Sequence, residues 1–504
     1  MLAGCSAALA LSLLSFAAAP GLEDANADTG ASISAAEASA ALDRVQALIA
    51  GTSAEPPREL TIALRDLAVA LPVLKGQQRE SAQALLARPT DGVGDPAGDG
   101  YTAPPADFRS SCSAGFCAHW VVSTADAPDP TDATPANGIP DFVDEVLAAA
   151  ETSATVQNVD LGWVTPRSDG VIGGNSKTDI YLKDIGNSGL FGYAAPDPGQ
   201  GAKRKQFAYL VIDNDYRAGQ YAGYASPADP MRVTVAHEYN HVIQFAYDTF
   251  QESWLFESTA TFIEDLVFPE IDDYVQTFVG AFTESPRTPI TDPNTDKIYG
   301  SAVLHHFLAN RFGPETTRDA WASSTDTKPK DFGIGALALV LKQEGSSFSR
   351  QFARFAAATA EWKATDVFPD TYPDVRRKGK LRVDRRKRTR LDHTAYVLYD
   401  VPVGGFADVS GNADLKLTVK TSRKARSGLA LIGRKGSAAG GKVVRELKYL
   451  NRGGRGSVKL KNVKRFDRIT AVAVNADGRA NNDGAFGFDY PRDDVRYTAK
   501  LKLR

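Results

Sequence analysis

The chain is poor in the residues that bind metals or carry thiol chemistry: its 504 residues include six histidines and three cysteines. After the N-terminal region, no stretch reaches the roughly 18 apolar residues that span a bilayer, which argues against a transmembrane segment. Internal repeats, a Walker-type loop and a dinucleotide fingerprint are also absent, which argues against repeat proteins and common nucleotide-binding enzymes. Few residues are therefore left as candidates for a functional site.

The N-terminus has the pattern of an export signal. An apolar run at 7–19 is followed by the small residues Ala25-Asn26-Ala27, as at a signal-peptide cleavage site. We expect residues 1–27 to be a signal peptide and the protein to be secreted, with retention at a bacterial cell surface as an alternative. The usual basic segment before the apolar run is missing, and Leu2-Ala3-Gly4-Cys5 resembles a lipoprotein processing site, although it precedes the apolar run.

Two further expectations follow from export. Cys112 and Cys117 should form one disulfide, because paired cysteines in an exported chain are normally oxidised. A loop rich in oxygen ligands could hold Ca²⁺, although its spacing does not match an EF-hand and a solvated turn is the alternative. The residues of this loop are Asp126, Asp129, Asp132, Asn137, Asp141 and Asp144.

The net charge of −3 is the sum of a strongly acidic N-terminal part and a strongly basic C-terminal part. From residue 371 onward there are 33 Lys and Arg against 13 Asp and Glu, a net of +20, so the first 370 residues carry −23. Ten of the fifteen residues 376–390 are basic, and we expect 371–395 to be a solvated linker. Such a surface attracts polyanions through a salt-sensitive term. Outside the cell, anionic cell-surface polymers are the expected partner and specific nucleic acid binding is not; the alternative is that the charge serves solubility.

The segment 235–245 contains His237-Glu238-Tyr239-Asn240-His241. On a helix, residues four apart lie on one face about 5–6 Å apart, so His237 and His241 can bind one metal ion. Glu238 can then take a proton from a water that the metal activates, without being a ligand itself. In random chains of this length and composition, a His-Glu-x-x-His motif should occur roughly 0.003 times per chain.

Glu257, sixteen residues after His241, is the candidate third ligand. The apolar spacing of 255–267 predicts a second helix that packs on the first, and a glutamate at its start would complete a His₂Glu zinc set. The alternative is a carboxylate favoured by the helix dipole. Structural zinc sites normally use four Cys or His ligands, which are missing nearby, so a catalytic-type site is expected. Thr261, Glu264 and Asp265 are candidates to orient a ligating imidazole.

His-Glu-x-x-His at 237–241 with Trp254-x-x-Glu257-x-x-Ala260 resembles the gluzincin metallopeptidases, and more narrowly a group of secreted bacterial proteins assigned as metallopeptidases by motif. The resemblance extends from about residue 108 to residue 313 and implies a zinc-dependent peptidase. The gap between the second histidine and the glutamate is shorter than in many gluzincins, so the connection must be tight.

Such enzymes often stabilise the developing oxyanion with a Tyr or His. Tyr299, which opens a helical run, is our candidate for this role. Tyr239, Tyr247, His305 and His306 remain alternatives.

The pattern along the chain predicts an α+β protein with three parts. Residues 28–105 form a helical N-terminal region and linker, which is either a removable pro-region or a permanent cap. Residues 106–370 form a zincin-like catalytic domain, in which 206–213 is the substrate-binding edge strand by analogy. Residues 396–504 alternate with period two and predict an antiparallel β-sandwich with outward lysines.

The sequence therefore predicts a secreted zinc metallopeptidase that acts on peptides or proteins. His237, His241 and Glu257 bind Zn²⁺, Glu238 is the general base and Tyr299 contacts the oxyanion. The alternative is a secreted binding or adhesion protein whose metal site is inactive or structural and which uses the basic sandwich.

Overall fold

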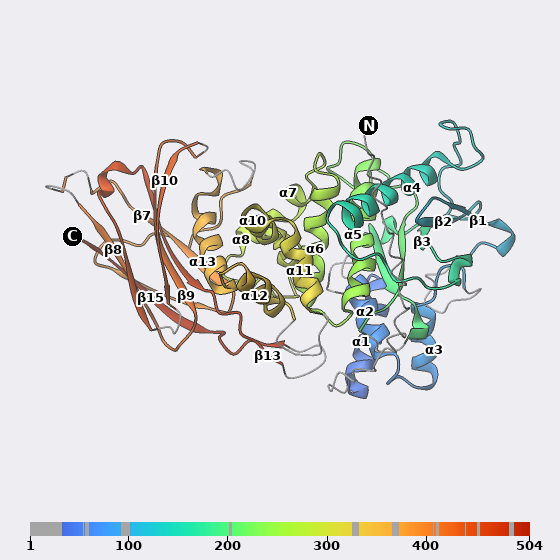
Figure 1. The fold of residues 1–504 in the computed structure, drawn as a ribbon, viewed down its shortest axis with the longest axis horizontal. Helices are drawn as coiled ribbons and strands as arrows, with labels where there is room; N and C mark the ends of the chain where they lie inside the picture. Colours follow the sequence, from blue (N-terminus) through green and yellow to red (C-terminus); the bar gives the residue numbers. More distant parts are fainter. Residues whose placement is uncertain are drawn as a thin grey trace, which may run out of the picture.

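The computed structural model describes residues 33–504 except 54, 56–59, 92–100, 201–203, 325–331, 365–371, 407, 410–412, 439, 451–453 and 483–487. The expected signal peptide lies outside the described residues. The molecule is elongated, with a β-sandwich at one end, a five-stranded sheet and the N-terminal helices at the other, and a helical body between them (Figure 1). Helices and antiparallel sheets both occur, as expected for an α+β protein. In the described part of the chain, none of the helices has the length and apolarity to cross a bilayer.

Five strands form the sheet beside the metal-binding motif. They are β1 (Phe108–Cys112), β2 (Phe116–Val121), β3 (Thr178–Lys183), β4 (Gly192–Pro196) and β5 (Ala208–Asp213), in the order β1-β2-β3-β5-β4. The predicted disulfide between Cys112 and Cys117 is confirmed and joins β1 to β2. The expectation that 206–213 is an edge strand is wrong. β5 lies inside the sheet, parallel to β3, and the antiparallel strand β4 forms the edge instead.

One face of this sheet is covered by three N-terminal helices, α1 (Ala35–Ile49), α2 (Leu60–Ala70) and α3 (Gly76–Leu85). Helix α1 begins with a capping box between Ser34 and Glu37, which satisfies backbone N–H groups of its first turn. Leucines of these helices share an apolar core with Tyr181, Tyr193 and Tyr209 of the sheet. The helices are thus a packed layer of the fold.

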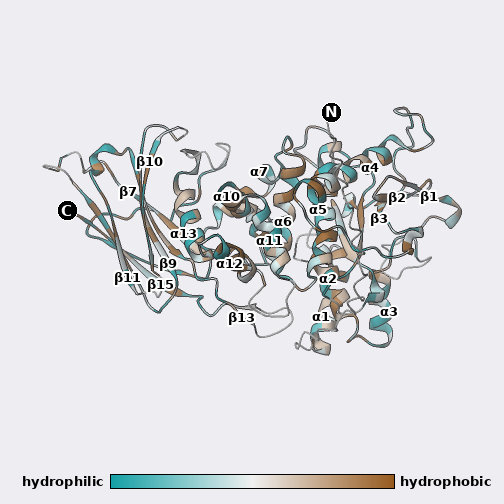
Figure 2. Ribbon diagram, in the orientation of Figure 1, coloured by the Kyte–Doolittle hydropathy of each residue, from teal (hydrophilic) through white to brown (hydrophobic). Residues whose placement is uncertain are grey.

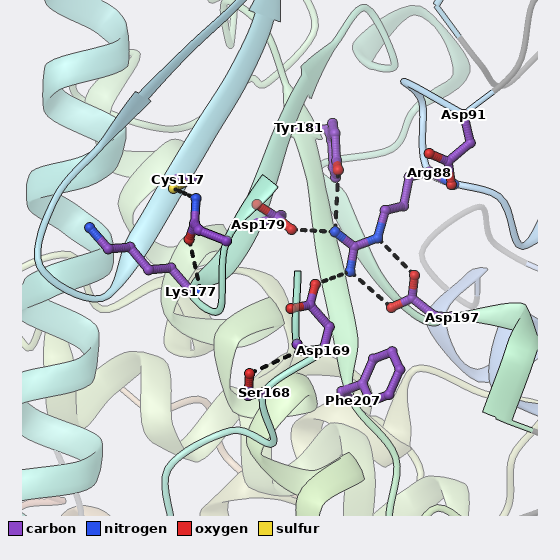
Figure 3. Close-up of polar contacts among 12 residues, drawn as sticks. Arg88, Asp91, Cys117, Ser168, Asp169, Lys177, Asp179, Tyr181, Asp197 and Phe207 are labelled. Atoms are coloured by element: carbon purple, nitrogen blue, oxygen red, sulfur yellow. Dashed lines mark hydrogen bonds and ion pairs between the residues drawn. The ribbon is translucent and has the colours of Figure 1, made fainter. Parts of the chain in front are cut away.

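Arg88 fixes the end of this N-terminal region to the sheet (Figure 3). Its buried guanidinium donates to Asp197 at 2.7 Å and to Asp169 at 2.6 Å, and also pairs with Asp179. The hydroxyl of Tyr209 donates to the carbonyls of residues 86 and 87. Loss of the region would expose an apolar sheet face and leave three buried or nearly buried carboxylates without their cation, which is costly.

The opposite face packs against the first two helices of the body, and the helices of the body together build the largest core. They are α4 (Asp141–Ala154), α5 (Ala228–Tyr247), α6 (Ser253–Val267), α7 (Asp273–Thr277), α8 (Val279–Glu284), α9 (Lys297–Gly300), α10 (Ala302–Phe312), α11 (Glu315–Ser323), α12 (Ile334–Gln343) and α13 (Phe348–Ala358). The two helices predicted around the metal-binding motif are confirmed as α5 and α6. Figure 2 shows hydrophobic residues along both helices, as their burial requires.

The C-terminal part consists of two four-stranded antiparallel sheets, ordered β10-β9-β12-β7 and β11-β8-β15-β6, and a two-stranded sheet of β13 and β14. The strands are β6 (Arg386–Leu391), β7 (Ala395–Val401), β8 (Leu415–Thr421), β9 (Ser427–Lys435), β10 (Lys442–Leu450), β11 (Arg455–Leu460), β12 (Arg468–Asn475), β13 (Asn481–Asn482), β14 (Phe488–Asp489) and β15 (Val495–Leu503). The segment 371–395, expected as a linker, therefore contains a strand of the sandwich. Its Thr389 and Leu391 point into the core while the arginines between and before them are exposed.

The sandwich is joined to the body by a buried carboxylate. Glu252, just before α6, accepts hydrogen bonds from the Trp254 indole and from the hydroxyl of Tyr490. Burial raises the pKa of Glu252 to about 7. This contact connects the turn between α5 and α6 to the C-terminal module.

Candidate metal centre

Helices α5 and α6 bring the three expected ligands together. α5 carries His237 and His241 one turn apart, with ring centroids 4.6 Å from each other. The chain then turns through residues 248–252 and enters α6, which carries Glu257. The short turn holds the two helices against each other and satisfies the tight connection that the sequence requires.

One ligand atom from each of His237, His241 and Glu257 lies within 4.8 Å of the others. The Nε2 atoms of the two imidazoles lie 3.2 Å and 3.6 Å from Oε2 of Glu257. His241 Nε2 and Glu257 Oε1 are buried and have no hydrogen-bond partner among the described residues. A buried polar atom without a partner costs about 1–3 kcal/mol. A cation between these atoms would supply that missing partner, so the residues fit a metal ion.

The other nitrogen of each imidazole is held by an acceptor. His237 Nδ1 lies 2.5 Å from Glu264, and His241 Nδ1 lies 2.7 Å from the amide oxygen of Gln244. Gln244 is itself fixed, because its amide nitrogen donates to Asn240 and to the carbonyl of Phe256. With both Nδ1 atoms engaged, the two Nε2 atoms face Glu257, the arrangement in which all three side chains could share one cation.

Among the three candidates for the orienting role, Glu264 makes the contact. Thr261 is buried but no contact to a ligand is seen, and Asp265 lies beside His306 at 3.7 Å. The sequence spacing left this choice open because all three residues fall within one turn of the second helix. In the folded protein, the rotation of α6 about its axis turns Glu264, and not the other two candidates, toward His237.

The centre is strongly acidic and buried. Burial raises the pKa of Glu264, and the carboxylates of Glu257 and Glu264 raise the pKa of His237 although burial acts against this. Burial also acts to raise the pKa of Glu257, but the two neighbouring imidazoles, His241 and His237, outweigh it and lower that pKa. Three carboxyl groups, Glu238, Glu257 and Glu264, thus share this buried space with the two imidazoles, and a cation at the three candidate ligands would stabilise their ionised forms.

A cavity of about 290 Å³ opens beside the centre and is lined by His237, Glu238, Glu264 and Tyr299. Tyr299 is nearly fully buried, and its ring lies 6.2 Å from the ring of His237. The rest of the lining mixes apolar side chains, among them Phe191, Val233 and Phe278, with the polar side chains of Tyr224, Thr234, Asp273 and Thr277. The predicted general base and the predicted oxyanion contact thus border the same space.

The alternative oxyanion residues are engaged elsewhere. Tyr239 donates to Asn158 at 2.6 Å, and the hydroxyl of Tyr247 accepts from a backbone N–H at 3.1 Å. His305 contacts Ser258 and Thr317, while His306 stacks on Tyr274. None of these four residues is among those that line the cavity.

Residues 105–427 match the sequence model of a family of unknown function, DUF6055. The chain belongs to the DUF6055 family. The match contains the five-stranded sheet, the candidate metal centre and the first strands of the sandwich, and it leaves out α1, α2 and α3. A search of curated proteins finds no match to this chain. Because DUF6055 has no assigned function, the resemblance to gluzincins stays a prediction.

Thr61 belongs to the site although it lies outside the DUF6055 match. Its hydroxyl donates to Glu238 Oε2 at 3.2 Å and accepts the backbone N–H of Ala194, on the edge strand β4, at 3.0 Å. Nothing in the sequence of α2 marks this residue, because a threonine in an apolar helical segment is unremarkable there. Gly192 permits the close approach of α5 to β4, since a Cβ at this position would lie 2.7 Å from Thr234 and 3.2 Å from Glu238.

The acidic loop of this DUF6055 member gathers no candidate cation site among the described residues, where His237, His241 and Glu257 are the one such group. Asp132 accepts the backbone N–H groups of Asn137 and Gly138, and Asp141 accepts those of Ala133 and Thr134. These carboxylates organise turns ahead of α4, so the structure gives the calcium prediction no support.

Proposed function

We propose that this protein is a secreted zinc-dependent peptidase. The observation that carries the proposal is the convergence of His237, His241 and Glu257 around buried atoms that lack partners, with Glu238 beside them on a cavity. Two His and one carboxylate with an open fourth position are typical of hydrolytic zinc sites. The disulfide between Cys112 and Cys117 agrees with an oxidising compartment outside the cytoplasm.

Zinc bound by these three residues would act as a Lewis acid on the scissile carbonyl and lower the pKa of water to about 7. The chain's own residues supply the rest. Glu238 accepts a proton from the attacking water and passes it to the leaving amine. Tyr299, at the cavity wall, donates a hydrogen bond to the oxygen on which negative charge develops.

The residues of the cavity wall indicate which kind of substrate side chain the cavity binds. Phe191, Val233 and Phe278 make one part of the wall apolar, so we expect an apolar side chain to be bound against that part, next to the scissile bond. The backbone N–H of Ala194 on the edge strand, which could otherwise pair with an extended peptide, is bound to Thr61. The substrate therefore reaches the centre through the cavity.

We infer that α1, α2 and α3, together with Arg88, are a permanent layer and not a removed pro-region. This inference rests on the apolar core that α1, α2 and α3 share with the sheet and on the three carboxylates that pair with Arg88. Without these helices, the apolar face of the sheet and the three carboxylates would be exposed to water. Peptidase activity should accordingly be present in the chain that keeps these helices.

Hydrolysis of a mixed peptide library by the purified chain tests the function. The untreated protein should cleave, the chelator-treated protein should not, and added zinc should restore cleavage. Glu238→Gln should bind zinc as the parent does and lose hydrolysis by at least about a hundredfold. Activity of this variant at the parent level would refute the mechanism. One equivalent of bound zinc without any cleavage would favour the alternative, a binding protein with an inactive metal site.

A further inference from the structure

One sheet of the sandwich carries an outer surface made almost entirely of cations and small hydroxyls. In β11-β8-β15-β6, alternate residues such as Leu417, Val458 and Tyr497 point into the core, and the residues between them point outward. We call the outward set the cationic face. It consists of Arg386, Arg388, Arg390, Lys416, Thr418, Lys420, Arg455, Ser457, Lys459, Arg496, Thr498, Lys500 and Lys502.

The strand register arranges these side chains in rows across the sheet. One row runs Arg388, Thr498, Lys420, Arg455, and the next runs Arg386, Lys500, Thr418, Ser457. Neighbouring strands lie about 4.8 Å apart and residues two apart on a strand lie about 7 Å apart. The cations therefore form a regular two-dimensional array on a continuous sheet and not a random scatter of charge.

This array is largely uncompensated within the described chain. Of its ten cations, ion pairs are found for Arg390, with Asp494 at 3.3 Å, and for Lys459, with Asp414 at 2.7 Å. Both partners lie at the ends of strands, and the outward positions of the four strands themselves include no acidic residue. Like charges at opposite positions on neighbouring strands destabilise a sheet. The array therefore carries an electrostatic repulsion that a bound polyanion would relieve.

The chemistry of the face favours an acidic polysaccharide over other polyanions. It presents no aromatic side chain on which bases could stack, as proteins that bind single-stranded nucleic acid do. It also presents no apolar side chain that could enter a bilayer. Thr418, Ser457 and Thr498 instead place hydroxyls between the cations, where they can hydrogen-bond to sugar hydroxyls and carboxylates.

We propose that the cationic face binds an extended polysaccharide that carries carboxylates. The face belongs to the sheet on the far side of the sandwich from the helical body, because β9, β12 and β7 of the other sheet pack toward α13 (Figure 1). A bound polymer would thus leave the cavity at the metal centre open. The site does not depend on the proposed peptidase activity.

Binding of the full chain to immobilised polygalacturonate tests the proposal, with uncharged dextran, anionic phospholipid vesicles and single-stranded DNA as comparison probes. The test variant is Arg388→Gln/Lys420→Gln/Lys500→Gln. The matched control removes three exposed lysines from the other sheet, as Lys435→Gln/Lys442→Gln/Lys448→Gln. Both variants change the net charge equally, and thermal unfolding of each checks that the sandwich is intact.

We expect polygalacturonate to bind in low salt, to be released by salt, and to be preferred over dextran, vesicles and DNA at equal ionic strength. The test variant should bind at least about tenfold more weakly than the control variant. Equal loss in the two variants would overturn the proposal, because net charge and not the face would then explain binding. Tighter binding to vesicles or DNA than to the polysaccharide would overturn the assignment of the partner.

Discussion

Glu264→Leu tests whether the orientation of His237 decides metal affinity. The substitution removes the acceptor that lies 2.5 Å from His237 Nδ1 and replaces it with an apolar side chain of similar length. Glu264 is almost fully buried, and the leucine side chain occupies most of the space that the carboxylate leaves. Nδ1 then has no partner, and the ring is free to rotate or to change tautomer.

The expected loss of zinc affinity follows from this contact. Loss of an outer partner of a metal-binding histidine typically lowers metal affinity about 10- to 100-fold, which corresponds to about 1.4–2.8 kcal/mol. Glu264→Gln keeps one oxygen acceptor and should fall between the parent and the leucine variant. Asp265→Leu is the matched control, because this neighbouring acid on α6 contacts His306 and not a ligand.

Competition between the metal-free protein and a chelating dye measures the zinc affinity of all four proteins. Circular dichroism during thermal unfolding shows whether each variant is folded. Parent-like zinc affinity in a folded Glu264→Leu variant would refute the role of this contact. An equal loss in Asp265→Leu would do the same, because the effect would then not depend on His237.

Three further substitutions have defined outcomes. Tyr299→Phe should lower the rate of hydrolysis about a hundredfold with unchanged zinc content, and a parent-like rate would exclude the oxyanion contact. Thr61→Val should lower the rate about tenfold because Glu238 loses a hydrogen bond, with recovery in Thr61→Ser; equal rates in both variants would argue against this. The pKa of Glu252 is raised from 4.5 to about 7, so its contribution to the free energy of unfolding is full below about pH 4.5 and lost as the pH rises through about 7. Glu252→Gln should flatten that decline, and an unchanged slope of stability against pH would contradict it.

Local patterns account for what the sequence could predict. His237, Glu238 and His241 are one turn of a single helix, so their spacing alone places them together. Glu257 required one further step, the packing of two neighbouring helices. The alternation of apolar and polar residues likewise predicted the C-terminal strands.

Features that depend on distant parts of the chain could not be predicted in this way. Thr61 reaches Glu238 across 177 residues, through the packing of α2 against β4. β4 became the edge because the chain folds back antiparallel before β5 enters the sheet. β6 was missed for another reason: its dense positive charge suggested a linker, although Thr389 and Leu391 already alternate with outward arginines.

The zinc content of the purified chain is the most direct test of the account. Metal analysis should find about one zinc per chain in the parent and in Glu238→Gln, because Glu238 is not a ligand. His241→Ala and Glu257→Ala, if folded, should retain less than about a tenth of it. A folded parent that takes up no zinc, or ligand variants that keep it, would contradict the assignment of His237, His241 and Glu257 as a metal centre.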